Sequence, residues 1–198
     1  YLIESDIAAA RAMYNIAQIT SQQPTVEFVA DCGFDFLLNE ILLMIDSTLL
    51  DSNSTADPSM LMESACAKIE SMGFSVGHRF VERMAQQKPT PFSTQNNTLE
   101  CVKFLCKDFW TSVFHKQIDK LQTNHRGVFV LKDLRFRWLD RLPAQDERSR
   151  TKAMKLLAFP CGLIRGALKN LGVECLVSCD FIADGITFSS TSFNVTLV

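Results

Sequence analysis

Cysteine and histidine are the side chains of this sequence that could carry out nucleophilic chemistry. Cys161 is expected close to a helix start, where the helix N-terminus lowers a thiol pKa, and three histidines elsewhere could act as a base: His78, His115 and His125. An isolated cysteine in an apolar stretch is more typical of a small core side chain than of a nucleophile. We therefore expect no catalytic residue and predict that the chain is not an enzyme.

The cysteine spacing does not favour a metal site either. Cys101 and Cys106 are five positions apart on a predicted helix, which places them on different faces. Cys175 and Cys179 share the face of a predicted strand, but at the usual strand rise they are about 13 Å apart. One zinc ion cannot bridge that distance. We expect no metal and no cofactor.

Composition indicates a globular protein. Of the 198 residues 47% are apolar and 10% aromatic, and 20 basic and 22 acidic side chains give a net charge of −2. No basic field favours nucleic acid or an anionic membrane surface. The odd number of cysteines, seven, fits free thiols in a reducing compartment, so we expect a cytoplasmic protein. No window reaches the roughly 18 apolar residues of a membrane span.

Apolar residues recur at helical spacing through the first part of the sequence. This period predicts helices over residues 34–50, 58–72, 76–86 and 99–121. Asp57 is a suitable N-cap ahead of Pro58, and Gly73 suits a left-handed C-terminal cap. We therefore expect an elbow between two helices at residues 72–75.

Later residues alternate with a period of two. Strands are predicted around residues 128–130 and 135–138, and a meander with an Asp184-Gly185 turn over residues 173–197. Between them, residues 142–150 should form a charged loop, and a helix over residues 161–171 follows Pro160, with Gly162 and Gly166 leaving the backbone open for close packing. The predicted fold class is α+β, a helical layer on an antiparallel sheet.

The early helices carry more aliphatic surface than one core face needs. Leu42, Leu43, Met44 and Ile45 are consecutive, and residues 60–62 add Met-Leu-Met. A second apolar face would meet another protein or a lipid chain, since large exposed apolar patches are uncommon on monomers. The alternative is that both faces lie inside one thicker core.

Three segments of the sequence, taken as a set, resemble a known family. They are Leu99–Asp133, with the pattern FLCKD…W…F.KQ.D.L.TNH.G..VL.D; Ser71-Met-Gly-Phe-Ser-Val-Gly77; and Pro160-Cys-Gly-Leu-Ile-Arg-Gly-Ala-Leu168. Together they are similar to the small core subunits of the transport protein particle (TRAPP), and specifically to the subunit-six branch of that Bet-three-like family. The resemblance covers residues 34–197. It implies one TRAPP small-subunit α+β domain over residues 33–198, with a twisted sheet, and leaves residues 1–32 as an N-terminal extension of unknown role.

The resemblance also implies a function and partners. It implies a non-catalytic scaffold subunit of a vesicle-tethering complex in ER-to-Golgi and intra-Golgi transport, where the assembled particle supports nucleotide exchange on a Rab-type GTPase. The location implied is cytoplasmic, peripheral at the cis-Golgi and ER. The implied partners are the other TRAPP subunits and, as a heterodimer, a related acylated small core subunit of the Bet-three type.

The resemblance implies that the early helices form the heterodimer interface. The expected interface residues are Leu38, Ile41, Leu42, Ile45, Leu61 and Ile69. The acylated relative carries a cysteine shortly after its Met-Gly-Phe elbow; Ser93 stands there in this chain, so thioester acylation is not expected. The alternative function is binding of a lipid, an acyl chain or another small hydrophobic ligand.

Overall fold

The computed structural model describes residues 31–52, 57–86, 98–124, 126–140, 142–184 and 187–198. Its elements are α2 (Asp31–Ser52), α3 (Pro58–Gln86), α4 (Thr98–Phe104), the π-helical turn η1 (Leu105–Phe109), α5 (Trp110–Phe114), β1 (Lys120–Thr123), β2 (Val128–Asp133), α6 (Glu147–Asn170), β3 (Cys175–Ala183) and β4 (Phe188–Leu197). The chain divides into two compact units, Tyr1–Leu37 and Leu38–Val198, and α2 runs across the division. All packing described below lies within the second unit.

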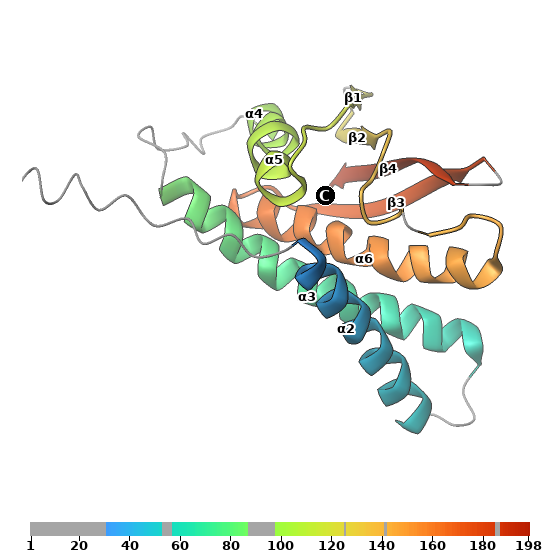
Figure 1. Cartoon of the computed structure of the whole chain (residues 1–198). Coiled ribbons are helices and arrows are strands. Elements are labelled where there is room, and N and C mark those ends of the chain that lie inside the picture. The colour runs from blue at the N-terminus through green and yellow to red at the C-terminus, as the bar shows by residue number, and fades with distance from the viewer. Residues whose placement is uncertain (1–30, 53–56, 87–97, 125, 141, 185–186) are drawn as a thin grey trace, which may run out of the picture. The chain divides into compact units, whose positions relative to one another are not determined.

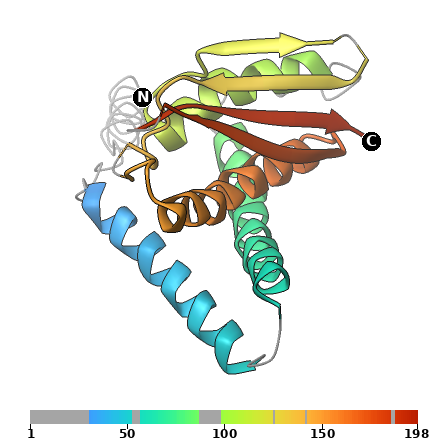
Figure 2. The same ribbon diagram turned by 90° about the vertical axis from the view of Figure 1, so that its right-hand side faces the viewer.

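The described strands form one antiparallel sheet in the order β1-β2-β4-β3 (Figure 2). On β3, Cys175, Val177, Cys179 and Phe181 are more buried than the residues between them, so one face of the strand is turned inward. Helix α6 packs against β3, and α3 packs on α6, which places α6 between the sheet and α3 (Figure 1). The predicted α+β class is confirmed.

Helices α3 and α6 touch through their main chains. A Cβ atom on Gly73 or Gly77 of α3 would lie 2.1 or 2.2 Å from a carbonyl oxygen of α6. The reverse holds for Gly162 and Gly166 of α6, whose Cβ atoms would lie 2.0 and 2.1 Å from carbonyl oxygens of α3. Each helix therefore lays a Gly-x3-Gly stretch on the backbone of the other, as predicted for Gly162 and Gly166.

Aromatic rings fill the core on the side of α4 and α5. The Trp110 ring lies 4.3 Å from that of Phe114 and 5.3 Å from that of Phe193 on β4, and Phe136 packs against all three. Trp110, Phe136 and Phe193 are almost fully buried. Tilted and edge-on ring pairs of this kind add stability beyond the area they bury.

Several predicted elements agree with the structure. Helix α2 matches the predicted helix over residues 34–50, and the Ser59 amide donates to Asp57 Oδ1 at 3.0 Å, which confirms Asp57 as the N-cap of α3. The predicted strand at residues 128–130 lies in β2, and the meander corresponds to β3 and β4. Helix α6 is followed by Gly172 with a φ of +82°, the left-handed conformation that glycine adopts readily.

Two helix boundaries were predicted wrongly. Gly73 was interpreted as a helix end and Pro160 as a helix start, which are the usual local roles of glycine and proline. Helix α3 continues through Gly73 to Gln86 without an elbow, since the missing side chain there admits α6 rather than ending a helix. Helix α6 begins at Glu147, capped by Asp146 Oδ1, which accepts from the Arg148 amide at 3.1 Å, and it contains Pro160 in its interior. The predicted loop at residues 142–150 therefore ends at Asp146.

The segment from Leu99 to Trp138 also differs from the prediction. The helix ends at Phe114, because His115 adopts a left-handed conformation with φ 59°, and the stretch is interrupted by η1. Residues 116–119 then lead into β1, so Ile118 and Leu121 are not helical. Residues 135–138 form turns rather than a strand. Their apolar side chains enter the aromatic cluster instead of a sheet face.

Candidate interaction surface

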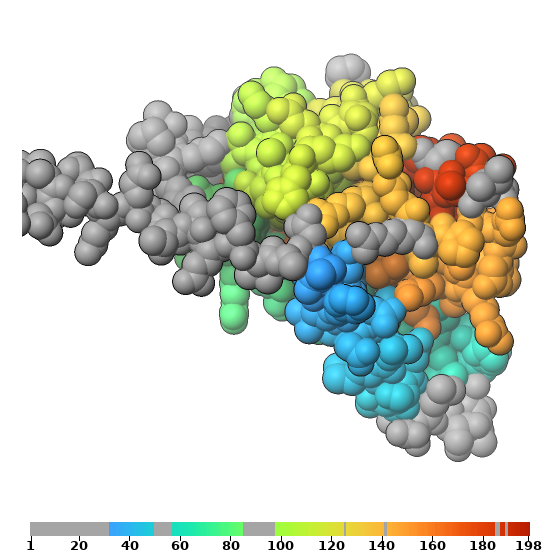
Figure 3. Space-filling view, viewed as in Figure 1, coloured from blue at the N-terminus to red at the C-terminus, as the bar shows by residue number. Residues whose placement is uncertain are grey.

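Helix α2 attaches to the rest of the domain through one side. Leu38, Leu42, Ile45 and Leu49 recur at steps of three and four and are all buried. Beside this stripe, Lys155 of α6 donates to Asp46 Oδ1 at 2.5 Å. The later turns of α2 thus lie at the surface beside α6, as Figure 3 shows.

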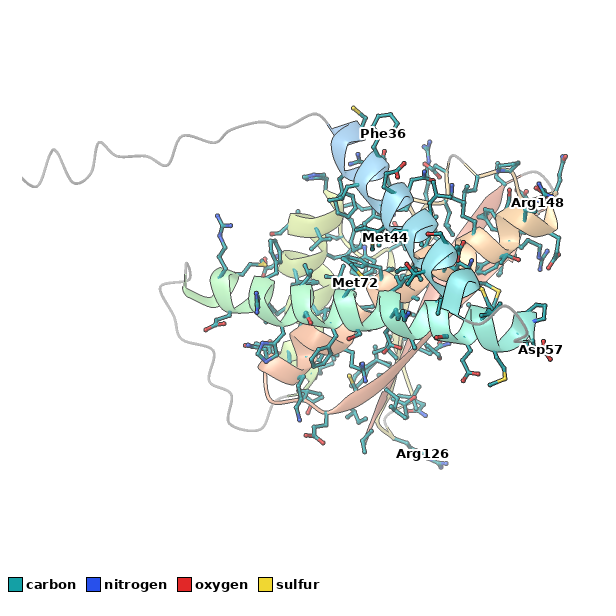
Figure 4. All side chains as sticks on the ribbon, turned by 90° about the horizontal axis from the view of Figure 1, so that it is seen from below. Phe36, Met44, Asp57, Met72, Arg126 and Arg148 are labelled. Atoms are coloured by element: carbon teal, nitrogen blue, oxygen red, sulfur yellow. The ribbon has the colours of Figure 1, made fainter. Side chains whose placement is uncertain are left out.

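A second apolar side of α2 and α3 remains open to solvent. Met44 on α2 is 57% exposed, and Met72 and Val76 on α3 are 37% and 47% exposed. Ile41 is half-buried one turn before Met44. Figure 4 shows Met44 and Met72 on the side of the two helices turned to the viewer. We call Ile41, Met44, Met72 and Val76 the α2–α3 apolar surface.

These exposures decide between the two explanations of the aliphatic surplus. Leu42 and Ile45 are buried, whereas their neighbours Leu43 and Met44 are more than half exposed. The same contrast holds at the start of α3, where Met60 is 67% exposed. The apolar residues do not all lie in one thick core, and a second face is available in the described chain.

The six expected interface residues lie in different environments. Leu38, Leu42, Ile45 and Ile69 are buried in the core of the chain itself, while Ile41 and Leu61 are partly buried at its edge. Leu61 lines a crevice of about 260 Å³ with Leu49, Met62 and Lys155. The interface as a set remains a prediction, and Ile41 and Leu61 are its accessible members.

Met72 and Val76 were missed at the sequence level. Met72 ends one predicted helix, 58–72, and Val76 begins the next, 76–86, so the two were not placed on one continuous helical face. A helix continued through Gly73 would have placed both on the side of α3 that carries Leu61 and Ile69, because residues three, four or seven apart share a face.

The polar residues of the long motif meet at one buried carboxylate. Asp133 at the end of β2 is fully buried; its Oδ1 accepts from Lys116 Nζ at 2.7 Å and its Oδ2 from Trp110 Nε1 at 3.2 Å. Lys116 also donates to Asp119 Oδ2 at 2.9 Å, and the same oxygen accepts from the Leu134 amide at 2.8 Å. The motif therefore joins α5, the following turn and β2.

Two pKa values reflect this network. Burial alone would lower the pKa of Lys116, but hydrogen bonds and charge attraction from Asp133 and Asp119 outweigh it and raise that pKa. Burial would likewise raise the pKa of Asp119, and the Leu134 amide with the Lys116 ammonium lowers it overall. Both shifts favour the charged forms, which is the behaviour of a structural ion pair.

Cys106, Cys161 and Cys175 are buried in environments that suppress thiol reactivity. The hydrogen bond with Cys179 and burial raise the pKa of the Cys161 thiol. Burial raises the pKa of Cys106 to about 12 and that of Cys175 to about 11. Cys161 lies in the interior of α6, not in its first turn, so the expected helix-start activation does not apply. Among the histidines, His78 has its Nδ1 atom 3.2 Å from Asn170 Nδ2. His115 is exposed, and His125 lies outside the described residues.

Two other sequence expectations concern ions and membranes. In the described ranges, no three side chains among histidine, cysteine, aspartate and glutamate gather closely enough to hold a metal ion. None of the described helices is both long enough and apolar enough to cross a membrane. Ser93, which stands where the acylated relative has its cysteine, lies outside the described residues.

Comparison with known proteins agrees with this picture over most of the chain. The family model described as transport protein particle (TRAPP) component matches residues 34–197. Trafficking protein particle complex subunit 6b of Danio rerio is 43% identical over 147 residues, which cover 74% of this chain and 86% of that protein. Subunit 6B of Mus musculus is 48% identical over 113 residues, covering 57% and 68%. Subunit 6A of Bos taurus is 46% identical over 115 residues, covering 58% and 69%.

A solved structure shows the same fold. The crystal structure of a trafficking protein particle complex subunit 3 from Naegleria fowleri, covalently bound to palmitic acid, superposes with a TM-score of 0.53 at 13% identity. The match covers 82% of this chain and 98% of that one. Taken together, the family match and the relatives at 43% to 48% identity show that the chain belongs to the transport protein particle (TRAPP) component family, in its subunit-six branch.

Proposed function

We propose that this protein is a non-catalytic scaffold subunit that pairs with a related small core TRAPP subunit through α2 and α3. The observation that carries the proposal is the α2–α3 apolar surface, where Met44, Met72 and Val76 are exposed on helices whose other sides are already packed. Exposed apolar side chains on helices are typical of a protein interface. Ile41 and Leu61 would form the edge of this interface, beside the buried stripe that holds α2.

The heterodimer partner in this proposal is an acylated subunit of the Bet-three type. A subunit of the same fold that is covalently bound to palmitic acid supports the choice of such a protein as the test partner. The domain in this proposal runs from residue 33 to 198, after an extension of residues 1–32. The assembled particle, rather than this chain alone, would support nucleotide exchange on a Rab-type GTPase in ER-to-Golgi and intra-Golgi transport, at the cytoplasmic surface of those membranes.

The test is co-expression of the full chain with the acylated small core subunit, followed by affinity purification of the partner and light-scattering mass. We expect a one-to-one heterodimer. Met44→Glu combined with Met72→Glu should abolish it, because two carboxylates would have to be desolvated in an apolar interface. Both side chains are exposed in the chain alone, so the variant should fold.

Leu134→Glu is the matched control, since it changes an apolar side chain of similar exposure, 48%, in the turn after β2. This control should retain the heterodimer. A chain that stays monomeric beside the partner would overturn the proposal. A fatty acyl group found on this chain by intact-mass spectrometry would instead support the ligand-binding alternative. Nucleotide release from a Rab-type GTPase by the purified chain alone would contradict the assignment of exchange to the assembled particle.

A further inference from the structure

Strand β3 lies at the end of the sheet that the structure describes. Among the strands that the structure describes, it pairs only with β4. The Val198 amide donates to the Glu174 carbonyl at 3.1 Å, and these two residues stand opposite each other in the β3–β4 register. In an antiparallel ladder hydrogen-bonded pairs alternate with non-bonded pairs. The bonded residues of β3 are therefore Leu176, Ser178 and Asp180.

The residues between them turn their main chain outward. Val177, Cys179 and Phe181 occupy the non-bonded positions opposite β4, so their N–H and C=O groups point away from the sheet. The edge is regular over this stretch, and the register shift comes only at Ile182 and Ala183. Natural proteins usually protect such an edge with a bulge, a proline or a covering segment, because it is a template for another strand.

A groove of about 390 Å³ runs along this edge. Five consecutive β3 residues, 177–181, line one side, which places the groove against the main chain of the strand rather than on one face of the sheet. The floor of the groove is formed by residues on one side of α6: Arg150, Met154, Ala158 and Cys161. Its other side is formed by Cys66 and Glu70 of α3. Met154 is 50% exposed there. A fifth strand would cover this part of α6.

One end of the groove carries the basic side chain of Arg150. Helix α6 and β3 run in opposite directions on either side of Gly172, and the Cys161 thiol is hydrogen-bonded to that of Cys179. Arg150, eleven residues before Cys161, therefore lies toward the Phe181 end of the edge. Its ion pair with Glu147 is long, at 4.0 Å, and both side chains are at least half exposed, which leaves the Arg150 cation able to bind a carboxylate.

We propose that the free edge of β3 binds an extended segment of another TRAPP subunit as a fifth strand. The segment bonds to the main chains of Val177, Cys179 and Phe181, places small or aliphatic side chains over Met154 and Ala158, and presents an acidic residue to Arg150. Main-chain bonds give such a site its affinity and the alternating pockets give its selectivity. This inference rests on the proposed function, because the segment comes from the same particle, and it uses a surface other than the α2–α3 apolar surface.

The test is amide hydrogen exchange, resolved to single residues by fragmentation mass spectrometry, on the purified chain and on the particle assembled around it. In the chain alone, the amides of Val177, Cys179 and Phe181 should exchange quickly while those of Ser178 and Asp180, bonded to β4, exchange slowly. In the particle, the three fast amides should slow by at least about tenfold. That alternation distinguishes strand addition from simple covering of the groove.

Cys179→Pro removes one outward N–H and leaves the ladder to β4 intact, a position at which an edge strand tolerates proline. In particles containing this variant, Val177 and Phe181 should exchange as they do in the free chain. Cys179→Ser, the matched control, keeps the amide and should keep the protection. Arg150→Glu should weaken the protection, while Arg83→Glu, an equal charge change on the exposed side of α3, should not.

The outcomes separate the two proposals. If the chain joins the particle and the three amides still exchange quickly, the strand inference is wrong and the scaffold function stands. If the chain does not join the particle, both are wrong. Slow exchange of these amides in the isolated chain overturns the inference as well. If the protein concentration has no effect on the exchange, the edge is covered within the chain. If protection grows with protein concentration, a second copy of the chain is the occupant.

Discussion

A Cβ atom on Gly77 of α3 would lie 2.2 Å from the carbonyl oxygen of Leu163 on α6. The obstructing atoms are main chain, which no side-chain rotation can move, so Gly77→Ala must separate the two helices. We expect this substitution to lower the free energy of unfolding by about 3 kcal/mol, at the upper end of overpacking effects. Urea denaturation followed by circular dichroism measures it. On an exposed helix the same change would raise stability by up to about 1 kcal/mol, so the sign alone is informative.

Ser75→Ala is the control for that experiment. Ser75 lies on the exposed side of α3, and its Oγ donates to the Ser71 carbonyl at 3.1 Å. A surface change of this kind should stay within about 0.5 kcal/mol. Equal stability of Gly77→Ala and the wild type would show that the two helices do not meet through their main chains.

The glycines also show what the sequence could and could not predict. Close packing was predicted at Gly162 and Gly166 from their spacing alone, and this is confirmed. Gly73 was given a local explanation, a C-terminal cap, although its role depends on Phe159, which is far away in the sequence. A single sequence contains the spacing of such residues but not the identity of the helix that packs on them.

A similar limit applies to the segments around α5 and α6. The period of apolar residues predicted one helix over residues 99–121, yet the chain leaves the helical conformation at His115 so that Lys116 can reach Asp133. Pro160 suggested a helix start, but α6 is packed by α3 on one side and the sheet on another, and that burial offsets the missing amide. Of the candidate interface, α2 was predicted correctly, whereas α3 was divided into two helices, so the exposed members Met72 and Val76 were not placed on one face.

Asp133 should be a principal determinant of stability in the region of the long motif. Its carboxylate accepts hydrogen bonds from Lys116, Trp110 and the Arg135 amide. Asp133→Ala leaves an indole N–H and an ammonium group without their acceptor, and we expect a loss of about 3 kcal/mol. Thermal denaturation and quenching of Trp110 fluorescence would report it. Asp140→Ala is the control, because its partner Arg135 is 82% exposed, and it should cost less than about 1 kcal/mol. Similar losses in both variants would contradict the assigned role of Asp133.

The pH dependence of stability should show both shifts of this network. The pKa of Asp119 is lowered in the folded protein, so its contribution is complete above the ordinary carboxylate pKa and is lost as pH falls through the lower folded value. The pKa of Lys116 is raised, so its contribution is complete below the ordinary lysine pKa and is lost as pH rises through the higher folded value. Asp119→Asn should reduce the loss of stability on acidification below about pH 4, measured by urea denaturation at several pH values. An unchanged acid limb would contradict the assigned shift.

Thiol labelling should separate the cysteines by environment. Cys32 is exposed and should react with iodoacetamide in the native protein, whereas Cys101, Cys106, Cys161 and Cys175 are buried. With a pKa of about 12, Cys106 has a thiolate fraction of roughly 10⁻⁴ at pH 8. We expect these four to be labelled only after unfolding in urea, with peptide mass spectrometry as the readout. Rapid, selective labelling of native Cys161 would instead favour a reactive thiol.

Helix α2 should be the first described helix to open locally. Between Leu38 and Leu49 the described contacts of α2 are four buried aliphatic side chains and polar bonds to α6, whereas α3 and α6 meet along their main chains. Leu42→Ala removes one of the four, and we expect a loss of about 2 to 5 kcal/mol, appearing first as faster amide exchange in α2 with α3 and α6 still protected. Leu43→Ala, at the next and exposed position, should leave exchange unchanged. If Leu42→Ala accelerates all three helices equally, α2 unfolds only with the whole domain. Binding of a partner to the α2–α3 apolar surface should slow α2 exchange in both variants, because the bound state adds contacts to the helix that opens most easily.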